Sequence, residues 1–220
     1  MHHIEAFQCH PTEQNKYYVG WEDAKSVPFT FKRMSIPEVI LVEPKAFNDE
    51  RGYFVEIYKE SNFAELGIDT QFVQDNLSRS VKGTLRGLHY QLNPEAQAKL
   101  VFAIRGTIFD VAVDVRKNSP TYGQWVGEVI SDGNHRGLFV PEGFAHGFCV
   151  MSDEADVFYK VTKEYSAGHE RGVIWNDAGI MIKWPTGSPT LSAKDAALPA
   201  LESAEKNFEY ERKTTVPKGP

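Results

Sequence analysis

The sequence predicts a mainly β protein with a jelly-roll architecture. From Glu38 onward, short segments rich in β-branched and aromatic residues recur at close spacing, and clusters of glycine, proline, asparagine, aspartate and serine separate them. Patterns typical of helices are sparse. Many short strands at regular spacing, without helices between them, favour an antiparallel sandwich or barrel.

Taken in chain order, the strand pattern occurs in residues 53–58, 100–104, 108–115, 125–130, 138–140, 146–151 and 157–162. It is clearest in residues 108–115, where apolar side chains alternate with Asp110, Ala112 and Asp114. Strict alternation indicates a half-buried strand, because successive side chains point to opposite faces of a sheet. Few helices are expected: residues 61–66, closed by Gly67, and part of 192–206, which Pro199 interrupts.

The chain of 220 residues is longer than the roughly 150 residues of an average domain. We therefore expect one jelly-roll body over residues 38–205, preceded by an N-terminal extension of unknown role over 1–37 and followed by a C-terminal tail over 206–220. The extension holds scattered aromatic residues and mixed charge without a sustained period.

Composition and charge exclude several function classes. The formal net charge of −6 argues against duplex nucleic acid as a partner, because duplex-binding proteins carry a basic footprint. No apolar run approaches the length of about 18 residues that a membrane span needs, and the first residues lack the pattern of a secretory signal. We expect a cytoplasmic protein with neither a nucleic-acid nor a membrane partner.

Residues 85–91 place a single histidine, His89, beside the flexible pair Arg86 and Gly87. Histidine titrates near neutral pH and is the usual general base once a carboxylate fixes its tautomer. A lone histidine is also commonly structural, so both interpretations stay open at this point.

Residues 141–147 match the second half of the cupin signature, in which the histidine, here His146, binds a metal. The first half of that signature supplies an H-x-H pair and a glutamate, whereas Gly87 and Gln91 stand two residues to either side of His89. One imidazole cannot build a site with three or four ligands. We therefore expect no metal, and we expect His146 to shape the pocket or a turn.

Three further polar residues have a structural as well as a functional interpretation. Tyr159 shares an alternating face with Val157 and Val161, as a core aromatic would. Asp195 fits a capping-box pattern that begins at Ser192, and Lys99 opens an apolar strand, where a lysine can protect a sheet edge. A guanidinium group can donate two parallel hydrogen bonds to two phosphate oxygens. The candidates for such a phosphate clamp are Arg51, Arg86 and Arg105.

An ordered set of short motifs runs through about residues 38–203. The motifs are residues 49–52, 72–76, 85–91, 109–114, 141–148, 159–162, 175–177, 184–185 and 191–195. Together they resemble the dTDP-4-dehydrorhamnose 3,5-epimerases, the cupin-fold nucleotide-sugar epimerases of the rhamnose pathway. Each motif alone is weak, but the ordered set is highly specific. The resemblance implies a cupin-type jelly roll that uses no cofactor.

The resemblance also implies the reaction: metal-independent epimerisation at C3 and C5 of a dTDP-linked 4-keto-6-deoxyhexose. The C4 ketone acidifies both protons because the carbanion delocalises into an enolate, and inversion requires a base on one face and an acid on the other. By the motif match, His89 is the base and Asp195 its orienting carboxylate. Tyr159 matches the opposed acid, and Lys99 matches the positive charge near the O4 enolate.

Substrate contacts carry over in the same way. The implied set is Arg51, Phe54, Glu56, Gln74, Asn76, Arg86, Asp110, His146, Tyr165 and Lys194. The first three match residues that reach the pocket from the neighbouring subunit of a homodimer that exchanges N-terminal strands. One position departs from the family: Glu164 stands where many relatives carry a second aromatic residue. The stacking on the base, and with it the identity of the nucleotide, therefore stays open.

Other functions remain as alternatives. The chain could invert a single centre or take a different nucleotide sugar, it could be a catalytically silent nucleotide-sugar binder, or it could be a metal-dependent oxygenase. The joint presence of His89, Tyr159 and Asp195 speaks against a binder, because binding alone needs neither a base nor an opposed acid.

Overall fold

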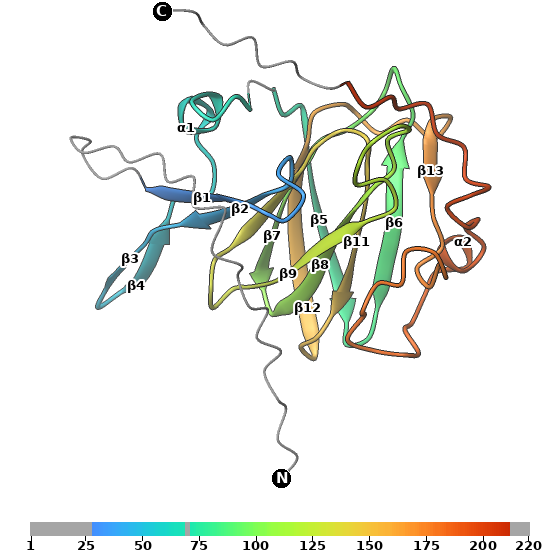
Figure 1. Cartoon of the computed structure of the whole chain (residues 1–220). Helices are drawn as coiled ribbons and strands as arrows, with labels where there is room; N and C mark the ends of the chain where they lie inside the picture. Colours follow the sequence, from blue (N-terminus) through green and yellow to red (C-terminus); the bar gives the residue numbers. More distant parts are fainter. Residues whose placement is uncertain (1–27, 69–70, 212–220) are drawn as a thin grey trace, which may run out of the picture.

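The computed structural model of the chain describes residues 28–68 and 71–211. In this part of the chain, two antiparallel β-sheets pack face to face (Figure 1). Within the same residues only two short helices are present, α1 (Glu60–Ala64) and α2 (Ala193–Ala196). The predicted mainly β jelly roll with few short helices is confirmed.

The larger sheet has six strands. Their spatial order is β1 (Phe29–Arg33), β2 (Ile40–Pro44), β10 (Gly137–Val140), β7 (Lys99–Arg105), β12 (Glu154–Val161) and β5 (Gln74–Val81). Strand β5 lies at an edge of this sheet, and β7 lies in its middle, between β10 and β12.

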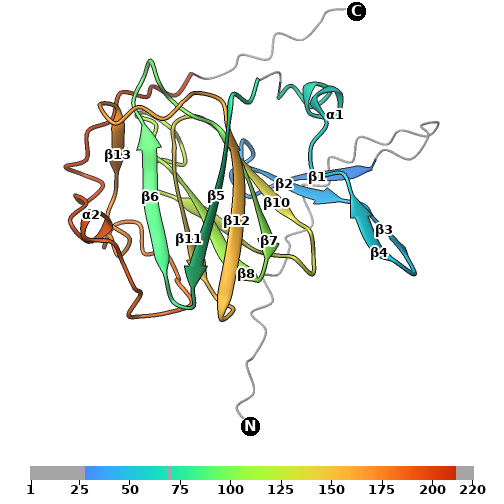
Figure 2. The same cartoon turned by 180° about the vertical axis from the view of Figure 1, so that it is seen from behind.

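The smaller sheet has five strands in the order β13 (Glu170–Gly172), β6 (Leu85–Gln91), β11 (Phe144–Val150), β8 (Thr107–Asp114) and β9 (Trp125–Ser131). Strands β3 (Ala46–Asp49) and β4 (Gly52–Val55) form a separate hairpin that projects from the body (Figure 1). Figure 2 shows the molecule from behind, where β5 of the larger sheet stands next to β6 of the smaller one.

Three layers of apolar side chains hold the sheets together. Between the sheets, Val101 of β7 packs in one cluster with Ile108 of β8 and Phe148 of β11. Phe63 of α1 belongs to a cluster with β1, β2, β7 and β10 of the larger sheet. Phe208 and other C-terminal residues pack with β6, β8 and β11 of the smaller sheet. Burial of this apolar surface is the main stabilising contribution to the fold.

Strand β8 is buried on both faces, so the predicted half-buried strand is wrong in this respect. Val111 and Val113 pack in the cluster with the C-terminal residues. Asp110 and Asp114, which alternate with them, are also 0% exposed. Alternation here separates two buried environments rather than a core from solvent, because Ile108 and Ala112 on the face of the two aspartates also pack in apolar clusters.

Most predicted strands are present, but several strands were missed. Segments 100–104 through 157–162 coincide with β7 to β12, whereas segment 53–58 is a strand only as far as Val55. The pattern did not find β1, β2, β3, β5, β6 or β13. Of residues 192–206 only Ala193–Ala196 is helical, because Pro199 can neither donate a helical hydrogen bond nor leave room for the preceding turn.

The ordered body reaches beyond residues 38–205 at both ends. Residues 29–33, assigned above to the extension, pair with β2 as strand β1. In the assigned tail, Phe208 is 6% exposed in the core, and Glu209 bridges to Lys117. Residues 1–27 and 212–220 lie outside the described residues. No helix in the described ranges is long and apolar enough to cross a membrane.

Candidate active site

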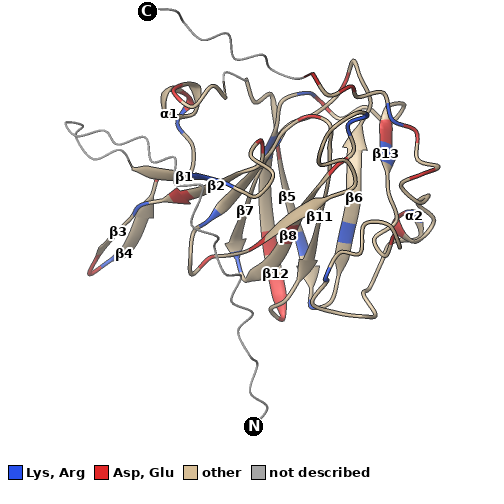
Figure 3. Ribbon diagram, in the orientation of Figure 1, with Lys and Arg blue, Asp and Glu red and all other residues tan. Residues whose placement is uncertain are grey.

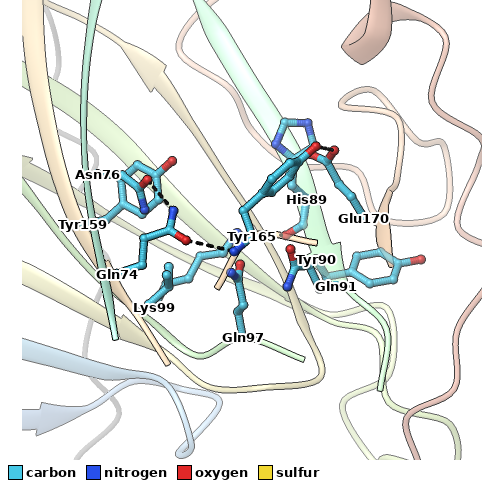
Figure 4. A pocket seen from close by; sticks show the side chains of 11 residues that line it. Gln74, Asn76, His89, Tyr90, Gln91, Gln97, Lys99, Tyr159, Tyr165 and Glu170 are labelled. Atoms are coloured by element: carbon cyan, nitrogen blue, oxygen red, sulfur yellow. Dashed lines mark hydrogen bonds between the residues drawn. The ribbon is translucent and has the colours of Figure 1, made fainter. Parts of the chain in front are cut away.

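A polar cleft lies between the two sheets, close to β5 and β6. It consists of two cavities of about 170 and 270 Å³. Both are lined by His89, Lys99 and Tyr159, and Figure 4 shows these three side chains with the other residues of the smaller cavity. All three are catalytic candidates by their sequence motifs, and the fold brings them together.

A bulge in β6 sets the direction of His89. His89 pairs with His146 and Arg86 pairs with Phe148, so between these pairs two residues of β6 lie opposite one residue of β11. The extra residue places Arg86 and His89, which regular alternation would separate, in the wall of the same 270 Å³ cavity. Gly87 in the bulge has φ +127°, and a Cβ there would lie 2.5 Å from a backbone atom of β11. Only glycine fits this position.

Asp195 holds the imidazole of His89. Its Oδ1 lies 2.7 Å from Nε2 of His89, although the two residues are 106 positions apart in the chain. The Oγ of Ser192 accepts the backbone N–H of Asp195 at 3.0 Å, so the predicted helix cap is present and also fixes the carboxylate. Burial raises the pKa of Asp195, but bonds from His89, Ser192 and the Gly87 backbone outweigh it and leave the pKa below its usual value.

Tyr159 faces the cleft from the opposite sheet. It lies on β12 between the buried valines of the predicted alternating face, while His89 lies on β6, and Figure 4 shows the two side chains on opposite sides of the cavity. Burial raises the pKa of Tyr159; the charge of Arg86 opposes this shift and that of Glu170 adds to it. The phenol therefore keeps its proton at neutral pH.

Lys99 opens β7 in the middle of the larger sheet, so the interpretation as edge protection is wrong. Its Nζ donates to the backbone oxygen of His89 at 3.4 Å. Burial lowers the pKa of Lys99 to about 8, while the negative charges of Asp110 and Glu170 oppose this shift. An ammonium group is thus held in a desolvated position between the two sheets.

The 170 Å³ cavity is lined by a hydrogen-bonded set of polar side chains. Gln74 donates to Asn76 at 2.8 Å and accepts the backbone N–H of Tyr165 at 2.8 Å. Tyr165 donates to Glu170 at 2.8 Å, and Lys194 forms an ion pair with the same carboxylate at 2.5 Å. Glu170 was not among the predicted residues, because no recognisable motif surrounds it and only the fold brings β13 to the cleft.

The 270 Å³ cavity is mainly basic. Arg86, Lys99 and Lys194 line it, with Asp195 as the only carboxylate among its lining residues. Elsewhere in the described chain acidic and basic residues are interspersed (Figure 3), and the whole protein carries a net charge of −6. The cavity therefore reverses the sign of the protein's charge locally, as an anionic ligand requires.

His146 lines the same cavity and is bonded to a single carboxylate. Its Nε2 lies 2.7 Å from Oδ1 of the fully buried Asp110. Within residues 28–68 and 71–211, no three histidine, cysteine, aspartate or glutamate side chains are placed to hold a metal ion. The cavity wall thus contains a second histidine–aspartate pair.

Five predicted residues line neither cavity of the single chain. Asp110, implied above as a substrate contact, is fully buried behind the cavity wall and bonds His146 instead. Arg51 forms an ion pair with Asp49 at the tip of the β3–β4 hairpin, Phe54 on the same hairpin is 67% exposed, and Glu56 follows β4. Arg105, a candidate for the phosphate clamp, lies 3.5 Å from Glu154.

The fold and the site together define a jelly-roll enzyme that performs acid–base chemistry on an anionic substrate. The family model for dTDP-4-dehydrorhamnose 3,5-epimerase matches residues 33–203. The chain belongs to this family, whose members are isomerases.

Individual relatives support this membership. The dTDP-4-dehydrorhamnose 3,5-epimerase of Shigella flexneri is 56% identical over 164 residues, which are 74% of this chain and 91% of the relative. A dTDP-6-deoxy-D-glucose-3,5-epimerase from Legionella pneumophila, crystallised with dTDP-4-keto-L-rhamnose, is 44% identical with a TM-score of 0.81, covering 84% of this chain and 100% of that one. A dTDP-4-dehydrorhamnose 3-epimerase of Streptomyces niveus is 42% identical over 74% of this chain and 79% of its own length.

Proposed function

We propose that the chain converts dTDP-4-dehydro-6-deoxyglucose into dTDP-4-dehydrorhamnose by inverting C3 and C5. The observation that carries this proposal is the His89–Asp195 pair on one wall of a cleft whose other wall holds Tyr159. Membership of the epimerase family supports it, as does the dTDP-4-keto-L-rhamnose in the Legionella relative.

His89 acts as the base on one face of the sugar. A carboxylate can only accept a hydrogen bond, so in the pair with Asp195 the Nε2 of a neutral His89 carries the proton and the lone pair is on Nδ1. Removal of a proton from C3 or C5 gives an enolate with its charge on O4. The imidazolium that forms is stabilised by Asp195, which keeps its negative charge.

Tyr159 returns a proton to the opposite face, which inverts the centre. Its raised pKa keeps the phenol protonated until the carbanion accepts the proton. Lys99 lies between the two walls and places its ammonium near the developing O4 charge. A fixed donor of this kind contributes about 3 kcal/mol to transition-state stabilisation.

The diphosphate and the nucleoside of the substrate bind in different cavities. Arg86 and Lys194 of the basic cavity bind the diphosphate, since both cations line it. Gln74, Asn76 and Tyr165 bind the nucleoside in the smaller, neutral cavity. His146 shapes the inner wall for the sugar.

We further propose a homodimer in which the β3–β4 hairpin of each copy reaches the cleft of the other. Arg51 and Phe54 are exposed on a hairpin away from their own cleft, and β5, which lines the cleft, is an edge strand available for pairing. Sedimentation analysis is expected to show a dimer, and Arg51→Ala is expected to raise KM more than it lowers kcat. A monomer with full activity would contradict this assembly. A cytoplasmic location belongs to the same proposal and is tested by cell fractionation.

The reaction is tested by incubating the protein with dTDP-4-dehydro-6-deoxyglucose in deuterated water. Proton NMR is expected to show deuterium at both C3 and C5 of the product, because each inverted centre takes its new hydrogen from solvent. A product with deuterium at neither carbon would contradict the proposal. Full turnover by a His89→Ala variant would show that His89 is not the base.

A single-centre epimerase is the second candidate, because a relative named as a 3-epimerase is 42% identical over 74% of this chain. The same experiment separates the two, since deuterium at one carbon alone would select the single-centre reaction. The nucleotide preference is open, because Glu164 leaves the stacking partner of the base undefined. Comparing turnover of the dTDP-linked sugar with that of its uridine analogue tests this preference.

A further inference from the structure

Asp110 of β8 is a buried carboxylate that is only half satisfied. It is 0% exposed, and its Oδ1 accepts a hydrogen bond from Nε2 of His146 at 2.7 Å. Within the described part of the chain, its Oδ2 has no hydrogen-bond partner. Burying an ionised carboxylate costs several kcal/mol unless a positive charge or further hydrogen bonds compensate. We therefore expect the negative charge of this buried carboxylate to serve the function of the site.

The negative charge of Asp110 lies behind the wall of the cleft. Asp110 does not line either cavity, but its partner His146 lines the 270 Å³ cavity together with Lys99. His146 donates a hydrogen bond to Asp110, and such a bond does not cancel the carboxylate's charge. Lys99 is the buried cation of this region. The charged and titratable groups around it, from every surrounding element, are His89 and Arg86 of β6, Asp110 of β8, His146 of β11, Tyr159 of β12, Glu170 of β13, and Lys194 and Asp195 of α2.

Two carboxylates favour the ammonium form of Lys99, and Asp110 has the larger effect. Glu170 already binds Lys194 and Tyr165, so much of its charge is compensated. Asp110 has no ion pair with a lysine or arginine in the described residues, and water screens a fully buried charge little. Even with both carboxylates in place, burial lowers the pKa of Lys99 to about 8.

We propose that Asp110 is a positioning residue that keeps Lys99 positively charged for the enolate step without touching the substrate. This inference rests on the proposed function, because it assigns a purpose to the charge of Lys99. A lysine that lost its proton would donate a weaker hydrogen bond to O4 and carry no charge to stabilise the enolate. Asp110 therefore extends the pH range over which the site works.

The test compares kcat/KM against pH for the wild type and Asp110→Asn. The free-enzyme profile of the wild type is expected to fall above about pH 8, as Lys99 loses its proton. Asparagine keeps an acceptor for His146 but removes the charge, so the alkaline limb is expected to move down by about one pH unit or more. Activity at pH 6 then stays near the wild-type value, while activity at pH 8 falls about fivefold or more.

Asp114→Asn is the matched control, since Asp114 lies on the same strand and is also 0% exposed, but bonds Arg116. It is expected to lower stability and to leave the alkaline limb in place. In a Lys99→Arg background, where the charge persists at all pH values, adding Asp110→Asn is expected to move no limb.

An unmoved limb in Asp110→Asn, or an equal loss of activity at every pH, would overturn the inference. Where Asp110→Asn does not accumulate as folded protein, Asp110→Ser removes the same charge from a smaller side chain and gives the same measurement. Product formation by the wild type, followed by NMR, tests the proposed function separately, so the two failures are distinguishable.

Discussion

The cleft contains two histidine–aspartate pairs with the same bond length and different surroundings. His89–Asp195 and His146–Asp110 are each joined at 2.7 Å, and the two histidines lie opposite each other on β6 and β11. The side chain of His89 is 26% exposed, whereas that of His146 is 8% exposed and its aspartate is completely buried.

The difference in burial separates two roles for one motif. A base must reach a substrate carbon, and only the imidazole of His89 is open to both cavities. The aspartates differ as well: Asp195 is held at the start of α2 by Ser192 and Gly87, while Asp110 keeps an unpaired oxygen within the described structure. In the proposed roles, Asp195 orients the base, and the negative charge of Asp110 keeps Lys99 protonated.

The largest expected effect on kcat is at the His89–Asp195 pair, the more exposed of the two. His89→Ala should lower kcat about 10³-fold, because it removes general-base catalysis. His146→Gln, which keeps a donor for Asp110, should cost less than about tenfold, because that hydrogen bond is retained. Steady-state kinetics of the two variants check this ranking. Equal losses in the two variants would erase the distinction between the pairs.

Lys99→Met should have the next largest effect. It keeps the length of the side chain but removes the charge near O4, so kcat should fall by about 10²-fold or more, equivalent to about 3 kcal/mol. KM should change much less, because the charge acts on the enolate rather than on the ketone. Initial rates over a range of substrate concentrations measure both constants, and a change confined to KM would place Lys99 in substrate binding instead.

The smallest expected effect is at the cap that holds Asp195. Ser192→Ala removes the acceptor of the Asp195 backbone N–H and should cost about 1 kcal/mol, seen as a lower Tm and a loss of about fivefold in kcat. Ser192→Thr, which can form the same cap, is the control and should keep both values. A Ser192→Ala variant with wild-type Tm and kcat would show that the cap does not orient the pair.

The sequence was informative where local pattern determines structure. Period-two alternation located β7 to β12, and the motif around His89 predicted residues that the fold brings together. Asp195 was the hardest case, since its local pattern indicates only a helix cap. The structure shows that the cap and the bond to His89 coexist in one residue.

Other features depend on tertiary contacts that no local pattern reveals. Strand β5 was missed because its inward residues, among them Gln74 and Asn76, are polar where they line the cleft. Glu170 was missed because β13 meets β6 only in the folded chain. The bulge that turns Arg86 and His89 to one face requires the partner strand β11, and alternation alone would place them on opposite faces.

The central claim is that base and acid act from opposite walls of one cleft, and Tyr159→Phe in deuterated water tests it most directly. With the phenol removed and His89 intact, the base should still remove the acidic hydrogens, exchange them with solvent and return deuterium to the same face. NMR should therefore show deuterium entering unreacted dTDP-4-dehydro-6-deoxyglucose while formation of the inverted product falls about 10²-fold. Exchange and inversion falling by the same factor would contradict a separate acid on the wall that carries Tyr159.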